Sequence, residues 1–332
     1  MLTCCAAWSQ QAADHLFAII VNGGKNKLMN HERYWNDCAF LFRTLRHDYH
    51  LPQRNITLLM SDGGEPGDDQ LLIGNNGFGS SLADLDGDGQ RDVFLAATMQ
   101  NLSSAITDLS SRLTTDDHLF VFLMDHGGSE DEWHDSYLWL WNSEVLSDAV
   151  LAMLLGQFNV GSMNIVAGQC YSGGFIDNLA QNGRVITTAC RGDELSWACP
   201  DKNYDEFVYH WTCAVAGHDD LGVPTAADSD GDGHVSMAEA FSYACDHDRR
   251  SETPQYVSQP ADLGERWTFA GMLSEGSDGL SAPRLADATP QVYDLLGRPV
   301  FFTSSTPLPP LLLYLPNSPT PQLHKIIVKP KR

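Results

Sequence analysis

Two reactive side chains follow apolar runs at separate points of the sequence. His126 comes shortly after the run Leu119–Met124 and is followed by two glycines. Cys170 comes shortly after Asn164–Ala167 and is followed by Tyr-Ser-Gly-Gly. Each feature alone is common among structural residues. Together, at the ends of successive strands, a cysteine and a histidine can act as nucleophile and general base. The adjacent glycines would let a substrate backbone approach closely.

The elements that must position these residues alternate between strands and helices. Continuous apolar runs predict strands, whereas helical spacing predicts a helix that is capped by Asn30 and ends near Pro52. The predicted strands are 16–21, 56–60, 118–124, 164–167 and 184–189, and the later predicted helices are 101–113, 144–155, one from about 174, and 205–216. This alternation predicts an α/β fold with a mostly parallel sheet, in which the chemistry lies at the carboxyl ends of the strands.

Two acidic loops have the spacing of calcium ligands. The second fits a twelve-residue EF-hand loop, with glycine at position 6 and a backbone carbonyl at position 7. Its candidate ligands are Asp228, Asp230, Asp232, His234 and Glu239. The first loop has Leu95 at position 12 and is closed by an acid at position 9. Its candidate ligands are Asp84, Asp86, Asp88, Gln90 and Asp92. Hard oxygen ligands favour Ca²⁺, and the alternative is an acidic turn stabilised by Asx hydrogen bonds.

Composition excludes several classes of function. With 332 residues, of which 43% are hydrophobic, the chain can form one large domain and a small appendage. A net charge of −23 argues against nucleic-acid binding through a basic face. No apolar run reaches the roughly 18–20 residues that a membrane-spanning helix needs. The eight cysteines do not follow a zinc-site pattern.

The composition of the chain changes toward both ends. Residues 1–13 resemble a remnant of a secretory signal peptide, with an ordinary frayed terminus as the alternative. Residues 14–272 carry the alternating pattern. A linker rich in Gly, Ser and Pro follows at 273–289, and residues 290–332 form a predicted β-rich C-terminal tail.

The ordered motifs resemble the legumain family of cysteine peptidases, within the caspase-like clan. The resemblance rests on His126-Gly127, Cys170, the first-helix segment Asn30–Cys38 and the segment Glu194–Cys199. It implies a caspase-like αβα sandwich with Cys170 as nucleophile and His126 as general base and acid. It also implies an oxyanion hole formed by the backbone N–H groups of Cys170 and Gly127.

The same resemblance implies a substrate pocket. In that family an Arg on the first helix, a Glu two residues before the nucleophile and a later Asp bind the carboxamide of a substrate Asn. Arg33 and Asp205 match the first and third positions, but Gly168 occupies the Glu position. Arg33 donating and Asp205 accepting still suit Asn, whereas the lost acceptor weakens discrimination against Asp. On the residues alone, Arg33 is also compatible with an exposed helix face.

The tail resembles the C-terminal sorting domain of bacterial proteins exported by the type IX secretion system. The segment that carries this resemblance includes Val292–Val300 and His324–Lys329. The resemblance implies an extracellular or cell-surface location and contact with secretion machinery. In that compartment disulfides are permitted, and pairs could form among Cys190, Cys199, Cys213 and Cys245.

We therefore expect a secreted, calcium-binding bacterial cysteine endopeptidase that acts on peptides or proteins after Asn, with Asp as an alternative residue. Two other functions fit the same residues. A transpeptidase would use the same Cys-His pair, because an amine as well as water can resolve an acyl-enzyme. A calcium-dependent surface-binding protein would use the fold without catalysis.

Overall fold

The computed structural model describes residues 13–73, 77–130 and 136–273, together with four short strands near the C-terminus. The chain divides into two units, Met1–Glu275 and Gly276–Arg332. Apart from Ala13 and Leu273, the predicted signal remnant and linker lie outside the described residues. Within the predicted tail, β14 (Val292–Tyr293) pairs with β15 (Pro299–Val300), and β16 (Leu312–Leu313) pairs with β17 (His324–Lys325).

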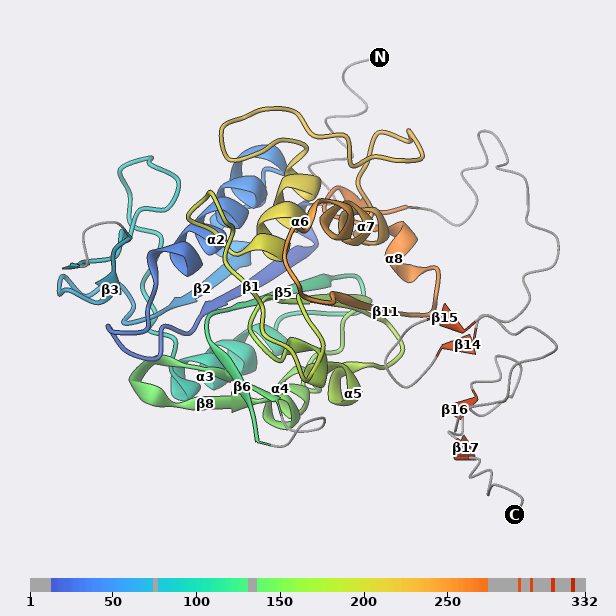
Figure 1. Cartoon of the computed structure of the whole chain (residues 1–332), viewed down its shortest axis with the longest axis horizontal. Helices are drawn as coiled ribbons and strands as arrows, with labels where there is room; N and C mark the ends of the chain where they lie inside the picture. Colours follow the sequence, from blue (N-terminus) through green and yellow to red (C-terminus); the bar gives the residue numbers. More distant parts are fainter. Residues whose placement is uncertain are drawn as a thin grey trace. The chain divides into compact units, whose positions relative to one another are not determined.

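A six-stranded sheet forms the centre of the first unit (Figure 1). Its strands run in the order β11-β10-β9-β5-β1-β2. Their bounds are β1 Leu16–Asn22, β2 Ile56–Met60, β5 His118–Met124, β9 Ser162–Ala167, β10 Arg184–Thr188 and β11 Gln255–Gln259. All neighbours are parallel except β11, which pairs antiparallel with β10 at one edge. The predicted mostly parallel sheet is therefore confirmed.

Helices cover both faces of this sheet (Figure 1). One face carries α2 (Glu32–Arg43), α6 (Glu206–Ala216) and α7 (Met237–His247), which share a core with Ala18 and Ile20 of β1. The other face carries α3 (Met99–Ser110), α4 (Asp148–Leu155) and α5 (Ile176–Leu179), which share a core with Ile19 and Val21. Because successive strand residues point to opposite faces, a continuous apolar run supplies both cores, and the result is an αβα sandwich.

Smaller elements lie outside the central sheet. They are the antiparallel pairs β3-β4 and β12-β13, the three-stranded sheet β6-β7-β8 and the short helix α8. Their bounds are β3 Gln70–Leu71, β4 Phe78–Gly79, β6 Gly127–Ser129, β7 Ser136–Trp139, β8 Val145–Ser147, α8 Leu263–Arg266, β12 Trp267–Thr268 and β13 Gly271–Met272.

Two predicted helix starts differ from the structure. Asn30 does not cap α2: its side chain is buried and donates to the Asp69 carbonyl at 3.0 Å, and the extended residue before the helix is His31. The predicted helix from Glu144 begins only at Asp148, because residues 145–147 pair with β7 instead. Ser147 then caps α4, because its hydroxyl accepts from the Val150 N–H. The apolar periodicity alone did not reveal this helix start.

Aromatic packing fixes α6 over the sheet. Trp211 of α6 is fully buried and stacks on Phe120 of β5, with ring centroids 5.8 Å apart and planes 5° from parallel. Phe269 meets both rings edge-on. This contact places the N-terminal end of α6 at the edge of the sheet where β5 ends.

Candidate active site

His126 and Cys170 lie at the same edge of the sheet. β5 and β9 are neighbouring parallel strands in register up to Leu123 and Ala167, so the segments that follow them leave the sheet side by side. The strand order changes direction between β1 and β5, next to the strand that His126 follows, since β1 connects to β2 on one side and has β5 on the other. Such a switch point is where parallel α/β sheets form their binding crevice.

Gly127 brings the two segments into contact. A Cβ placed on Gly127 would collide with the Cys170 carbonyl oxygen and would lie 2.7 Å from Cγ of Gln169. Gly127 lies opposite Leu138 in the antiparallel ladder between β6 and β7, and the flanking Trp139 N–H donates to the His126 carbonyl. Gly127 and Leu138 are therefore a non-hydrogen-bonded pair of that ladder. The sheet ladder therefore leaves the Gly127 N–H available to a substrate oxygen.

The Cys170 thiol is half-buried and faces a loop from another part of the chain. Among the described residues it donates to the Ser196 carbonyl at 3.6 Å rather than to His126. Burial raises the pKa of this thiol, and the nearby carboxylates of Asp205 and Glu252 act in the same direction. The resting thiol is therefore protonated at neutral pH.

The His126 imidazole is partly buried among positive and aromatic groups. Its ring lies against Tyr34 and His31, with centroids 5.2 and 5.4 Å away. Burial lowers the pKa of His126 to about 4, and the charges of His31, Arg33 and Lys25 add to this, while a hydrogen bond to the Met29 backbone opposes it. At neutral pH the imidazole is uncharged and able to accept a proton. At neutral pH the thiol and the imidazole are thus both uncharged.

The predicted pocket residues Arg33 and Asp205 form an ion pair. Arg33 Nε donates to Asp205 Oδ2 at 3.0 Å and to Oδ1 at 3.3 Å, and both side chains are largely buried. Asp205 precedes α6 and also donates its backbone N–H to the Asp37 carboxyl. Burial and the Asp205 charge raise the pKa of Asp37 well above its ordinary value. Asp37 therefore keeps its proton to a higher pH than an exposed aspartate does.

Gly168 differs from the predicted pocket in a way that the structure explains. It follows β9 and donates its N–H to the Leu123 carbonyl at 2.9 Å. A Cβ at this position would lie 2.6 Å from both Met124 Sδ and Val208 Cγ1. Any larger residue at this position would require the Met124 and Val208 side chains to shift. The packing of this core thus favours glycine at the position where the resemblance implies an acidic side chain.

Asp125 is a site residue that the sequence reasoning missed. It is fully buried immediately before His126, with a left-handed backbone angle φ of 143°. Its carboxyl accepts the N–H groups of Gly24 and His126, each at 2.6 Å. Burial raises the pKa of Asp125 to about 7. The acid thus ties the end of β5 to the loop after β1 and fixes the backbone on which His126 stands.

Glu252 is a second missed residue, and it holds the loop that contacts Cys170. Its Oε2 accepts the Trp197 N–H at 3.0 Å, directly beside Ser196. Arg250, two residues before Glu252, also binds this loop: it donates to the Ala198 carbonyl at 2.7 Å. Burial and the neighbouring Asp248 raise the pKa of Glu252 to about 9. No motif marks Glu252, because its partners come from a segment more than 50 residues away.

In each of the two predicted calcium loops, some of the candidate ligands lie close together. Three aspartates of each loop bring one carboxylate oxygen each within 4.8 Å of the others: Asp84, Asp86 and Asp88, and Asp228, Asp230 and Asp232. Both loops repeat one pattern, in which the first Asp accepts the N–H groups of positions 4 and 6. The backbone N–H groups of Gln90 and His234, at position 7, each donate to the Asp at position 5.

Asp92 and Glu239, the acids predicted to close these loops, accept hydrogen bonds from other groups. Asp92 accepts the Leu85 N–H at 2.7 Å and the Gln53 amide at 2.8 Å. Glu239 accepts from Ser229 with one oxygen and forms a capping box with Ser236, at the start of α7, with the other. The clustered aspartate oxygens of both loops have the chemistry that Ca²⁺ prefers.

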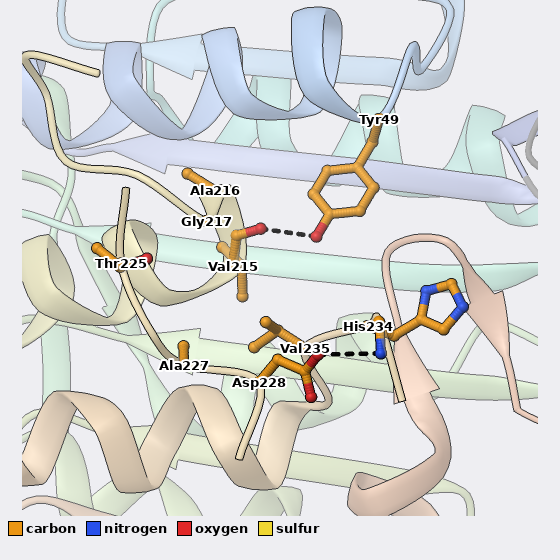
Figure 2. A pocket seen from close by; sticks show the side chains of 10 residues that line it. Tyr49, Val215, Ala216, Gly217, Thr225, Ala227, Asp228, His234 and Val235 are labelled. Atoms are coloured by element: carbon orange, nitrogen blue, oxygen red, sulfur yellow. Dashed lines mark hydrogen bonds between the residues drawn. The ribbon is translucent and has the colours of Figure 1, made fainter. Parts of the chain in front are cut away.

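A cavity of about 270 Å³ lies beside the second acidic loop (Figure 2). Tyr49, the end of α6 and the loop residues Asp228 and His234 line it, and Tyr49 donates to the Val215 carbonyl across it. Neither Cys170 nor His126 contributes to this cavity.

Six cysteines in the described part of the chain are free thiols, so the disulfides considered from the sequence do not form there. They are Cys38, Cys170, Cys190, Cys199, Cys213 and Cys245.

The central part of the chain is similar to a known protein family. Residues 94–221 match the model of the Peptidase C13 family. The match to Peptidase C13 includes His126, Cys170 and Asp205, whereas Arg33 and both acidic loops lie outside it. It supports a cysteine peptidase of the legumain kind. No curated protein matches the sequence. A crystal structure of a Geobacter sulfurreducens protein is similar at 13% identity with a TM-score of 0.44, over 78% of this chain and 99% of that one.

The buried Glu252 carboxyl predicts a fall of stability with pH. Its pKa is about 9 in the folded protein against 4.5 ordinarily, so the folded state binds more protons between these values. Its contribution is complete below about pH 4 and is lost as the pH rises through 9. In urea denaturation at pH 5, 7 and 9, Glu252→Gln should therefore flatten the decline of the unfolding free energy. The exposed Glu265→Gln is the control, and an unchanged decline in Glu252→Gln would contradict the assignment.

Proposed function

We propose that this protein is a cysteine endopeptidase that uses Cys170 and His126 to form an acyl-enzyme. One observation carries the proposal: the two residues follow neighbouring parallel strands within the segment that matches Peptidase C13. The contact between Gly127 and Cys170 supports it, because it brings the two backbones together at one point.

The mechanism starts from a neutral pair. His126 takes the thiol proton as Cys170 Sγ attacks the scissile carbonyl carbon, forming an S–C bond. The oxyanion receives hydrogen bonds from the N–H groups of Gly127 and Cys170. The C–N bond then breaks, and the leaving amine takes the proton from His126. Water, deprotonated by His126, releases the acid product and restores the thiol.

We infer that Arg33 and Asp205 bind the side chain before the scissile bond. In the free protein they are paired with each other, so a substrate must insert between them or share them. An Asn side chain satisfies both, because its carbonyl accepts from Arg33 and its amide donates to Asp205. A substrate Asp would face the Asp205 carboxylate, which favours Asn over Asp at neutral pH.

We further propose that the acidic loops bind Ca²⁺ in a structural role. The residues that would hold the ion are the three clustered aspartates of each loop, with the position-7 carbonyls of Gln90 and His234. Bound calcium would offset two of the three negative charges that otherwise repel one another at close range. In the second loop it would also stabilise the start of α7, since Glu239 belongs to both.

Secretion is the remaining part of the proposal. It is supported by the resemblance of the tail to a sorting domain and by the calcium-type loops, which suit a calcium-rich compartment. In the described part of the chain, no helix combines the length and apolar character that a membrane crossing requires. Cell fractionation of a strain that expresses the chain with and without residues 290–332 tests this, and retention of both forms in the cytoplasm would overturn it.

Catalysis is tested by removing each reacting side chain. Cys170→Ala should abolish hydrolysis of an Asn-containing peptide, because it removes the proposed attacking sulfur. His126→Ala should lower kcat/KM by about 10²–10⁴-fold, as expected for loss of a general base. Cys245→Ala, a half-buried thiol elsewhere, is the matched control. If Cys170→Ala remains active while its circular dichroism is unchanged, Cys170 is not the nucleophile.

Specificity is tested by the ratio of kcat/KM for Asn and Asp substrates across pH. Burial raises the pKa of Asp205, so Asp205 loses its charge as the pH falls, and cleavage after Asp should gain relative to Asn. Asp205→Asn should produce the same gain at neutral pH, whereas Arg33→Ala should impair both substrates. The exposed Arg112→Ala should change neither. A preference for Lys or Arg substrates would rule out this pocket.

Calcium binding is tested by titration calorimetry and thermal unfolding. The melting temperature should rise with added Ca²⁺ and fall with chelator, because an ion that binds only the folded state stabilises it. Asp230→Asn with Asp232→Asn should remove most of that dependence, while the exposed Asp246→Asn should retain it. No heat of binding and identical melting curves in calcium and chelator would refute the proposal.

A further inference from the structure

Tyr34 connects the proposed substrate pocket to the proposed base. It is almost fully buried in the first turns of α2. Arg33 Nη2 donates to the Tyr34 hydroxyl at 2.6 Å, and the Arg33 guanidinium lies 4.3 Å from the centre of the Tyr34 ring. On its other side the hydroxyl is 3.3 Å from Nδ1 and 3.4 Å from Nε2 of His126.

The direction of these hydrogen bonds follows from the donors present. Arg33 can only donate, so the Tyr34 oxygen accepts from it. Burial, together with Asp205, raises the pKa of Tyr34 well above 10, so the phenol keeps its proton. That proton is left to point at a nitrogen of the neutral His126 ring, whose plane is 82° from that of Tyr34. In the free protein the hydroxyl thus donates to the one acceptor nitrogen of the neutral ring, and this hydrogen bond must break before that nitrogen takes the Cys170 proton.

Other charged groups also face His126 and must be separated from this effect. Lys25 comes from the loop after β1, and His31 and Arg33 come from the start of α2. Asp125, on the segment of His126 itself, accepts the His126 backbone N–H. Tyr34→Phe retains all four of these groups, and of them only Arg33 loses a hydrogen bond, the one that its Nη2 donates to the Tyr34 hydroxyl.

We propose that Tyr34 is a positioning residue for the reaction: its hydroxyl, oriented by Arg33, holds the His126 ring in place and favours its neutral form. The inference deepens the proposed function and rests on it for its catalytic meaning. It names a direct physical link between the residue that binds the substrate side chain and the residue that moves the proton.

The first test measures His126 directly and does not depend on activity. The full chain is labelled with ¹³C at histidine Cε1, and the His126 resonance is assigned with His126→Gln. Because a donor to neutral imidazole is lost, Tyr34→Phe should raise the His126 pKa by roughly half a unit to one unit. Tyr49→Phe, which removes another buried hydroxyl bonded to Val215, should leave it unchanged. An unchanged His126 pKa in Tyr34→Phe overturns the proposal.

The second test uses the pH profile of peptide hydrolysis. In Tyr34→Phe the acidic limb of kcat/KM should move to higher pH, so that the loss relative to wild type is larger near pH 4.5 than near pH 7. A loss that is equal at all pH values would show a merely structural role and would overturn the proposal. If Cys170→Ala proves active, the proposed function fails, whereas the resonance measurement still decides whether Tyr34 controls His126.

Discussion

The ion pair between Arg33 and Asp205 organises the edge of the sheet at which the site lies. It joins the start of α2 to the start of α6, two segments separated by 172 positions in the chain. Two charges so thoroughly removed from water must be paired, and loss of one partner from such a pair typically costs about 3–5 kcal/mol. The Asp37 carboxyl accepts the Asp205 backbone N–H and the Tyr34 hydroxyl accepts from Arg33, so both members of the pair make further hydrogen bonds. The positions of the proposed substrate pocket and of the proposed base thus depend on one electrostatic contact.

Burial decides the protonation state of the reacting groups. Cys170 and His126 both lose hydration, and this favours the uncharged form of each. Acidic groups near the thiol and cations near the imidazole also disfavour an ion pair of thiolate and imidazolium in the free protein. In the proposed reaction the charge separation would therefore develop with substrate bound, when the proposed oxyanion donors are also engaged.

Much of the framework could be predicted from the sequence, for identifiable reasons. The strands β1, β2 and β5 are continuous apolar runs with clear polar ends, and the His126 and Cys170 segments follow from their placement after such runs. Arg33 and Asp205 were expected in one pocket only through a family resemblance, because no local pattern shows that two helices meet. Asp125, Tyr34 and Glu252 escaped prediction, since their roles arise from long-range burial. Similarly, the EF-hand pattern assigned Glu239 to an ion and therefore did not predict the capping box that Glu239 forms with Ser236.

The crowding at Gly168 has an evolutionary consequence. Two neighbours, Met124 from β5 and Val208 from α6, occupy the volume that any side chain at this position would enter. A larger residue here requires both neighbours to shift or to be replaced by smaller residues, and a smaller neighbour alone would leave a void in the core. The residues tolerated at these three positions are therefore coupled: an acidic side chain at position 168 would have to be accompanied by repacking at positions 124 and 208.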